Sequence, residues 1–330
     1  ALMLIALLYL YYKTGTFNIE SWYLPKYHLS LLEQKYLFAA FFLAFAIKIP
    51  MWPLHTWLPD AHTEAPAGGS VILAALMLKL GGYGFLRFSL PITPNACQYF
   101  EWGMIVLSLI AIVYVGLIAL AQKDMKRLIA YSSVAHMGFV TLGCFIALVI
   151  WQVNHNQADS FMAMEGAMTQ MISHAFGSGA MFLAFGVLYH QMHTRQIDNF
   201  GGIAKTMPVF AAFFMIYAMS NVGLPGTSGF VGEFMIILSS FQTSFWVTFL
   251  AASTLVVGAA YTLTMYKRVF YGPIVNDQVA KLRDVRGPDL LAFILLAAAV
   301  LCLGLYPNFL LNMMHSSVHQ ILELSVRSKF

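Results

Sequence analysis

Long apolar runs, separated by short polar segments, make up most of this 330-residue chain. A helix needs about 20 apolar residues to cross a bilayer, and a shorter run at 1–12 is followed by runs of at least that length at 34–58, 66–88, 99–121, 127–151, 161–189, 205–240, 244–270 and 288–311. An open sheet cannot satisfy its backbone in lipid, and no ten-residue alternation indicates a barrel. The pattern therefore predicts an all-α polytopic membrane protein.

Two of these runs are interrupted by helix-breaking residues. Prolines follow Lys48 in the first of them, and Gly223-Leu-Pro-Gly-Thr-Ser-Gly229 lies in the middle of the 205–240 run. Proline removes a backbone donor and clashes with the preceding turn, so both helices are predicted to be discontinuous. Broken backbone persists at membrane depth only where it lines a polar cavity or is buried in protein. The residues expected at the breaks are Pro50, Pro53, Gly223, Pro225 and Gly226; Pro59 follows the first group.

Composition excludes the soluble classes of protein. Hydrophobic residues make up 60% of the chain and charged residues 10%, which leaves too little polar surface for a water-soluble body of this size. The formal net charge of +4 is too small to indicate nucleic acid as a partner. Three widely spaced cysteines make neither a disulfide framework nor a zinc site, and no metal site is expected.

The lysines and arginines predict an orientation. Most of them fall on one side of the predicted spans, and cytoplasmic loops are enriched in these residues. The loops at 122–127, 190–204 and 268–287 are therefore predicted to be cytoplasmic, the 13–33 loop lies opposite, and Met313 to Lys329 forms an amphipathic or interfacial tail. Because the chain starts without Met inside an apolar run, we expect an N-terminal part to be missing.

A few ionisable side chains lie where the centres of spans should be. A lysine or glutamate at mid-bilayer costs at least about 2.5 kcal/mol, so each should face protein or water. A buried lysine can exchange between charged and neutral forms, histidine titrates near neutral pH, and arginine stays charged. The hypothesis is a proton relay, in which Glu233 is interpreted as the only carboxylate deep within a span; the alternative is structural polar contacts between helices. The residues are Lys48, Lys79, His136, His174 and Glu233.

Other polar and small residues give weaker signals. A group of ionisable residues falls at cytoplasmic helix ends, where a proton entrance and solvated helix caps are both open interpretations. Gly81-Gly82-Tyr83-Gly84 indicates close helix packing, because no strand precedes it as a nucleotide loop would require. The possible entrance residues are Asp60, His62, Glu64 and Asp124.

Three long motifs carry a family resemblance that covers essentially the whole chain. They are Phe45 to Pro66, which contains Lys48-Ile-Pro-Met-Trp-Pro-Leu-His; Asp124 to Phe139, which contains Ala130-Tyr-Ser-Ser-Val-Ala-His136; and Gly223 to Phe234, which ends in Gly232-Glu-Phe. Together they resemble the antiporter-like subunits of respiratory complex I. Within that family, Glu233 and the Thr194 to Gly202 loop are similar to the M, or chain-four, type.

The resemblance implies a fold of fourteen helices with two inverted five-helix repeats, each holding a discontinuous helix. Residues 1–98 would end the first repeat, 99–270 would form the second, and 271–330 would be the final transmembrane helix and tail. It also implies that Lys48 is the lysine of the seventh helix, Lys79 the central lysine of the eighth and Glu233 the terminal glutamate of the twelfth. The family's partner glutamate for Lys48, on the fifth helix, has no counterpart in this sequence.

The expected function is proton translocation as a membrane-arm subunit of NADH:quinone oxidoreductase, in a bacterial inner membrane rather than an organelle. No dinucleotide-binding glycines, CxxC clusters or haem-type ligands are present, so no cofactor is expected in this chain. FMN, iron-sulfur clusters and quinone would belong to partner subunits, and the antiporter-like L and N types would be neighbours. Two alternatives stay open: a subunit of a multi-subunit cation/proton antiporter or an energy-converting hydrogenase, and a structural spacer that conducts nothing.

Overall fold

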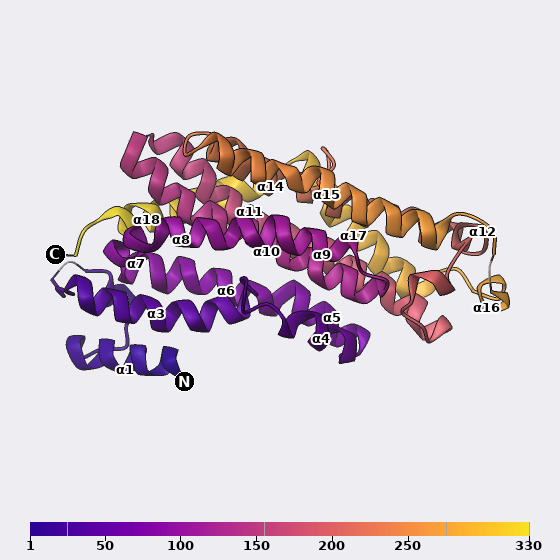
Figure 1. Cartoon of the computed structure of the whole chain (residues 1–330), viewed down its shortest axis with the longest axis horizontal. Coiled ribbons are helices and arrows are strands. Elements are labelled where there is room, and N and C mark those ends of the chain that lie inside the picture. Colours follow the sequence, from indigo (N-terminus) through magenta and orange to yellow (C-terminus); the bar gives the residue numbers. More distant parts are fainter. Residues whose placement is uncertain (25, 155, 275, 330) are drawn as a thin grey trace.

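The chain folds into a bundle of helices that run along one common axis (Figure 1). The computed structural model describes residues 1–24, 26–154, 156–274 and 276–329. Within these ranges no strand is formed, and only an isolated bridge joins Asp124 to Gln196. The predicted all-α fold class is therefore confirmed.

The first part of the bundle carries the first broken helix and two continuous spans. Its elements are α1 (Leu2–Thr14), α2 (Ile19–Trp22), α3 (Leu31–Lys48), α4 (Trp57–Glu64), α5 (Ala67–Ile72), η1 (Leu73–Met77), α6 (Leu78–Gly84), η2 (Phe85–Ser89), α7 (Leu90–Ile92), α8 (Pro94–Ile110), η3 (Ala111–Val115) and α9 (Gly116–Leu120). The three η elements are π-helical turns that continue the α-helices around them, and the sequence pattern does not predict them.

The second part begins with the two longest helices. Its elements are α10 (Met125–Asn154), α11 (Gln157–Met192), the 3₁₀ turn η4 (Ile197–Asn199), α12 (Ile203–Thr206), α13 (Pro208–Val222), α14 (Ser228–Ser240), α15 (Phe245–Phe270), α16 (Asp277–Ala280), α17 (Gly287–Leu305) and α18 (Asn308–Val326). The predicted interfacial tail is thus helical over most of its length.

Among the residues that the structure describes, six helical stretches are long and apolar enough to cross a membrane. They are Ala67–Ile92, Pro94–Leu120, Met125–Val153, Gln157–Met192, Phe245–Phe270 and Gly287–Leu305. In the most apolar 18-residue stretch of Met125–Val153 every residue is buried, whereas in that of Gly287–Leu305 only 17% of the residues are buried. Helix α10 is therefore the centre of the bundle, and α17 presents most of its apolar surface outward, as lipid contact requires.

The first break separates α3 from α4, as predicted. Helix α3 ends at Lys48, and Pro50 and Pro53 lie in the irregular segment that follows. The indole Nε1 of Trp57 donates to the carbonyl of Ile47 at 2.9 Å, which satisfies an acceptor near the end of α3. Pro59 lies inside the first turn of α4, where its missing donor costs nothing, so it does not break a helix.

The second break separates α13 from α14. Gly223 and Gly226 have φ angles of +78° and +90°, conformations that glycine adopts without strain, and Pro225 lies between them. A Cβ on Gly229 would lie 2.0 Å from the carbonyl oxygen of Ser220, so the two half-helices pass in direct backbone contact. The predicted discontinuity of the 205–240 run is confirmed.

The three lysine- and arginine-rich loops lie together at one end of the bundle. The amide of Ile197 donates to the carbonyl of Lys123 at 2.9 Å, and the amide of Gly202 donates to the carbonyl of Tyr271 at 3.1 Å. At the other end, the ammonium group of Lys329 donates to the carbonyl of Trp22. The grouping of loops agrees with the charge count, while the division at residues 98 and 270 stays a prediction.

Candidate proton-relay site

Lys79 lies on α6, directly after the π-helical turn η1. Its ammonium Nζ donates to the carbonyl of Ala74 at 2.6 Å and lies 2.6 Å from Nδ1 of His174 on α11. The contact with His174 is a hydrogen bond between two groups that both exchange protons. Helix α6 thus delivers the central lysine to the imidazole of the neighbouring helix.

A second buried pair lies on the far side of His174. The imidazole rings of His174 and His136 have centroids 5.8 Å apart, and Nδ1 of His136 lies 2.5 Å from Oε1 of Glu233 on α14. The amide Nε2 of Gln170 also donates to Oε1 of Glu233 at 2.8 Å. These contacts bring Lys79, His174, His136 and Glu233 into one line across four helices.

The one opening in this line is the gap between the two imidazoles. A small cavity there, with room for about one water molecule, is lined by His136, Gln170, Ser173, His174, Gly177, Ser178, Ser220, Asn221 and Gly229. Among the described residues, Nε2 of His136, Nε2 of His174 and Oγ of Ser173 have no hydrogen-bond partner. Buried polar atoms need partners, so water in this cavity would complete the line.

Glycines allow the helices of the site to approach closely. A Cβ on Gly81 would lie 2.6 Å from the backbone nitrogen of Ile49, and one on Gly82 would lie 2.4 Å from Sδ of Met171. A Cβ on Gly232 would lie 2.6 Å from the backbone nitrogen of Gln170. The close packing predicted for Gly81 to Gly84 is confirmed, and it holds the lysine and the glutamate against α11.

The second break lies beside the carboxyl group of Glu233. A Cβ at Gly223 would lie 3.4 Å from Oε2, whereas Oε1 faces His136 and Gln170. Glu233 is 2% exposed, so its charge depends on these neighbours and not on bulk water. The discontinuous helix therefore places the glycine backbone of the break next to the carboxyl group at the end of the candidate relay.

Lys48 is the one predicted relay residue that the structure leaves outside this line. It is the last residue of α3, its side chain is exposed, and no hydrogen bond or ion pair reaches it from the described part of the chain. Four of the five predicted residues are therefore brought together. The glutamate partner expected to precede Ala1 stays a prediction.

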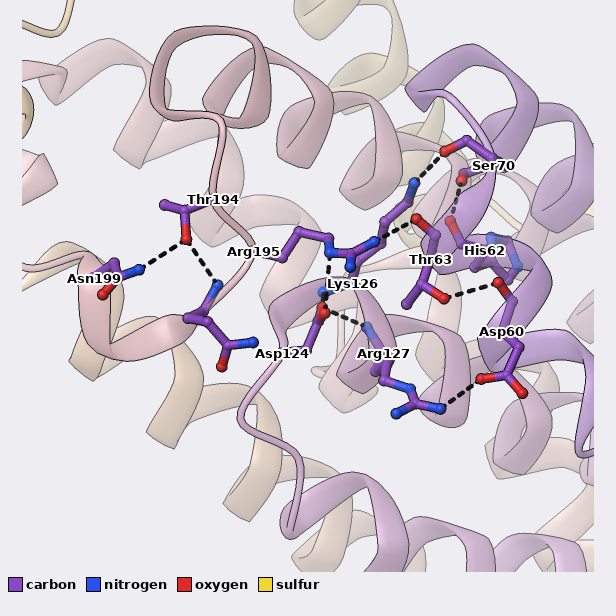
Figure 2. Close-up of polar contacts among 12 residues, drawn as sticks. Asp60, His62, Thr63, Ser70, Asp124, Lys126, Arg127, Thr194, Arg195 and Asn199 are labelled. Atoms are coloured by element: carbon purple, nitrogen blue, oxygen red, sulfur yellow. Dashed lines mark hydrogen bonds and ion pairs between the residues drawn. The ribbon is translucent and has the colours of Figure 1, made fainter.

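Three of the possible entrance residues, Asp60, His62 and Asp124, lie close together in a polar cluster at the end of the bundle with the basic loops (Figure 2). The fourth, Glu64, lines a cavity beside them. Oδ1 of Asp124 accepts from the backbone amides of Lys126 and Arg127 at 2.8 and 3.1 Å, so Asp124 caps α10. Its other oxygen lies 3.3 Å from Nε of Arg195, and Asp60 pairs with Arg127 at 2.5 Å.

This cluster also encloses a cavity. Nζ of Lys126 donates to the carbonyl of Ala65 at 2.6 Å, and Nη1 of Arg195 donates to the carbonyl of Thr63 (Figure 2). The cavity, of about 230 Å³, is lined by Thr63, Glu64, Ala65, Pro66, Ala67, Lys126, Phe185, Tyr189 and Arg195. Asp60, Glu64 and Asp124 are thus grouped with three basic residues that sequence analysis did not assign to the site.

His62 differs from the rest of this cluster because it is completely buried. Its ring stacks on Phe182 with centroids 4.3 Å apart, and neither ring nitrogen has a partner among the described residues. Burial first, and the charge of Lys126 second, lower the pKa of His62 to about 3. The geometry supports a neutral packing residue and not a proton acceptor at an entrance.

Two further carboxylates are buried nearer the ends of predicted spans, where sequence analysis did not select them: Glu101 on α8 and Glu165 on α11 are each 8% exposed. Sequence analysis also missed Gln170 and Ser173, although a polar amide within a long apolar run was a visible signal. No group of three or more potential metal ligands occurs in the described part of the chain.

Comparisons with known proteins now decide the family. The sequence profile of the family described as NADH:quinone oxidoreductase/Mrp antiporter, TM matches residues 1–258. The chain belongs to this family. The resemblance seen in its motifs is thereby confirmed.

Two comparisons refine that assignment, and a third supports the fold. NADH-quinone oxidoreductase subunit M of Rhodobacter capsulatus is 47% identical over 98% of this chain and 63% of its own length. A chain of respiratory complex I from Thermus thermophilus with bound NADH is 31% identical, with a TM-score of 0.87 over 99% of this chain and 66% of that one. A chain of the Mrp complex from Dietzia sp. DQ12-45-1b, 20% identical over 99% of this chain and 67% of that one, shares the fold with a TM-score of 0.80. The antiporter-like fold is confirmed, and the chain spans less than two thirds of the Rhodobacter relative.

Proposed function

We propose that this chain translocates protons as a membrane-arm subunit of an NADH:quinone oxidoreductase. The observation that carries the proposal is the buried line from Lys79 through His174 and His136 to Glu233. Each member can gain or lose a proton, and both ends are held at hydrogen-bond distance. The similarity to subunit M of Rhodobacter capsulatus and to a complex I chain supports the choice of complex.

The proton moves along this line by exchange of hydrogen bonds. The ammonium group of Lys79 gives a proton to Nδ1 of His174, and Lys79 becomes a neutral amine. His174 releases a proton from Nε2 to water in the cavity, and that water gives one to Nε2 of His136. His136 then passes the proton on Nδ1 to the carboxylate of Glu233, so one proton crosses. Both imidazoles are left in the opposite tautomer, and each must return its proton to the other ring nitrogen before the reloaded Lys79 can give the next one.

This chain's role in the enzyme is transport, and the redox chemistry belongs to partners. FMN, iron-sulfur clusters and quinone would be held by other subunits, with antiporter-like L and N types as neighbours in the membrane. The bilayer would be a bacterial inner membrane, since several of the relatives are bacterial proteins. Reduction of quinone elsewhere would drive the change in charge that loads and empties Lys79.

Protons would enter through the polar cluster at the cytoplasmic end. Asp60 and Glu64 are exposed, and Glu64 also lines the adjoining cavity; both would attract protons from the loops. Asp124 is buried beside Arg195 and would receive protons only from within the cluster. Lys126 and Arg195 would hold their charge in place. His62 is not part of this route, because its ring is buried and unpartnered within the described residues.

A cation/proton antiporter subunit of the multi-subunit type is the second candidate. The fold that this chain shares with the Mrp chain favours it, but that likeness is of fold alone at 20% identity. A membrane subunit of an energy-converting hydrogenase would use the same residues. In a purified complex, a flavoprotein that oxidises NADH would identify the oxidoreductase, whereas its absence would favour these alternatives.

The test is substitution of the central lysine in the complete complex in sealed vesicles. Lys79→Ala should leave assembly intact and lower proton transport and coupled quinone reduction by at least about tenfold, as loss of a proton carrier does. Lys205→Ala, an exposed lysine near the cytoplasmic loops, is the matched control. Transport by Lys79→Ala at the wild-type rate would leave the spacer hypothesis standing.

A further inference from the structure

One face of α11 carries three polar side chains at helical spacing. Glu165, Thr169 and Ser173 are four residues apart, so they lie above one another on the same side of the helix. They are 8%, 2% and 1% exposed, in a span that is otherwise largely apolar. At about 1.5 Å per residue, the row extends roughly 12 Å along the helix.

The Ser173 end of this row lies at the cavity between the two imidazoles of the proposed relay. Ser173 lines the small cavity between His136 and His174. Gln170 lines the same cavity, and its amide donates to Glu233 at 2.8 Å. Among the described residues, the hydroxyl groups of Thr169 and Ser173 have no hydrogen-bond partner. Two unsatisfied hydroxyls in sequence, both more than nine-tenths buried, indicate that water is held along this face.

The Glu165 end of the row is linked to the surface by an exposed side chain of helix α18. Nδ1 of His315 on α18 lies 3.2 Å from Oε1 of Glu165, and its side chain is 65% exposed. Phe161 packs against the rings of both His315 and His319, with centroids 4.6 and 5.9 Å away. His319 in turn lies 3.5 Å from the carboxylate of Glu323. A buried acid is thus connected to a row of exposed titratable groups.

This end of α11 is the one away from the basic loops. Helices α10 and α11 connect near Asn156, and α18 lies alongside in the same half of the bundle (Figure 1). The tail that follows α18 is fixed to the opposite-side loop through Lys329 and Trp22. Glu165 and His315 therefore lie between Glu233 and the face from which protons must leave.

We propose that Glu165 and His315 form a proton-release site that empties Glu233 toward the non-cytoplasmic face, an inference that rests on the proposed function. The carboxylic acid of Glu233 gives its proton to water at Thr169, and that water gives a proton to the carboxylate of Glu165. Glu165 passes it to Nδ1 of His315, and the imidazolium releases a proton to outside water. One proton leaves, and each group returns to its starting form.

The test compares Glu165→Gln with Glu101→Gln in the complete complex in sealed vesicles. Both residues are buried glutamates with 8% exposure, but Glu101 bonds Gln152 at 3.0 Å on α10, away from the row. Glu165→Gln should lower proton transport by at least about tenfold, because an amide cannot carry the proton. Glu101→Gln should leave transport unchanged, and Glu165→Asp should restore part of it.

Infrared difference spectra during turnover give a readout that packing would not alter. A carboxylic-acid band that disappears in Glu165→Gln and persists in Glu101→Gln would support proton uptake at Glu165. If Glu165→Gln does not assemble, Thr169→Val, which keeps the shape and removes the hydroxyl, should still slow transport. The release site would be overturned if Thr169→Val transported protons at the wild-type rate and the carboxylic-acid band in its infrared difference spectrum were the same as in the wild type.

Comparison with Glu233→Gln separates this proposal from the proposed function. If Glu233→Gln blocks transport while Glu165→Gln transports normally, the release site is wrong and the relay stands. If both transport normally, the chain does not carry protons by this line at all. Equal losses in Glu165→Gln and Glu101→Gln would also overturn the site, since burial alone would then explain them.

Discussion

The carboxyl group of Glu233 is buried among polar neighbours. The amide of Gln170 donates to its Oε1 at 2.8 Å, and Nδ1 of His136 lies 2.5 Å from the same oxygen. The break at Gly223 lies next to its second oxygen. These contacts place a carboxyl group at the end of the proposed relay.

Glu233→Gln is therefore expected to lower proton transport by at least about tenfold, because the amide keeps the shape but cannot titrate. Glu233→Asp should retain part of the activity. Transport is measured in sealed vesicles against the rate of quinone reduction. If the glutamine variant transports as well as the wild type, Glu233 serves only packing and hydrogen bonding.

His62 should affect stability at acid pH and not transport. Its pKa is about 3 in the folded chain, against an ordinary value of 6.5. Between these values the unfolded chain binds a proton that the folded chain excludes, so stability is complete above pH 6.5 and falls as the pH drops toward 3. His62→Phe should keep the stacking on Phe182 and reduce that loss.

Thermal unfolding of wild type and His62→Phe at pH 7.5 and pH 5, which are chosen on either side of the ordinary value, checks this. The variant should lose less stability between the two conditions and should transport protons normally at the higher pH. A variant that folds well but no longer transports protons would restore His62 to the entrance.

Residue types were predictable from the sequence, but their partners were not. The sequence identified Lys79, His136, His174 and Glu233, because an ionisable side chain in the middle of a span is costly and is therefore expected to have a partner or a function. Which atoms meet depends on helix rotation and spacing, so the bond of Gln170 to Glu233 was not visible. Glu165 was overlooked because it is near one end of its run, and only the tertiary structure shows that it is buried.

At the scale of elements, the breaks were predictable and the π-helical turns were not. Proline and glycine interrupt a helix through properties of the residue itself, the missing backbone donor of proline and the positive φ angles that glycine allows, so the sequence alone shows where a helix breaks. The turn at Leu73–Met77 contains ordinary helix-forming residues, so its altered hydrogen bonding comes from packing in the folded chain. It lies directly before Lys79 and includes Ala74, whose carbonyl accepts from the ammonium group.

Gly229→Ala tests the contact between the half-helices. A Cβ there would lie 2.0 Å from the carbonyl oxygen of Ser220, and backbone must move to admit it. We expect a loss of about 1–3 kcal/mol in the free energy of unfolding. Gly103→Ala is the control, since nothing lies within 4 Å of its Cβ position on α8. Equal melting temperatures for the two variants would contradict the close packing.

At the scale of the molecule, one aspartate joins two elements at the end of the bundle that carries the basic loops. Asp124 caps α10 and pairs with Arg195, so it fixes the start of the central helix to the loop after α11. The sequence indicated Asp124 as a possible entrance residue, but its contact with Arg195, far along the chain, could be found only in the folded structure.

Asp124→Ala should cost about 1 kcal/mol, the typical effect of losing a helix cap. Asp198→Ala removes an exposed pair with Arg268 and should cost much less. Melting temperatures in detergent, with both variants at equal ionic strength, measure the difference. A larger loss for Asp198→Ala would show that the end of the bundle is held elsewhere.

The 5.8 Å separation of the two imidazoles limits how much charge the interior can hold. At an effective dielectric constant of about 20, two imidazolium ions that far apart repel by about 3 kcal/mol. Simultaneous protonation of both is therefore disfavoured by roughly a hundredfold or more. In the proposed relay, protons would therefore pass one at a time, and a second proton would stay on Lys79 until Glu233 has taken the first.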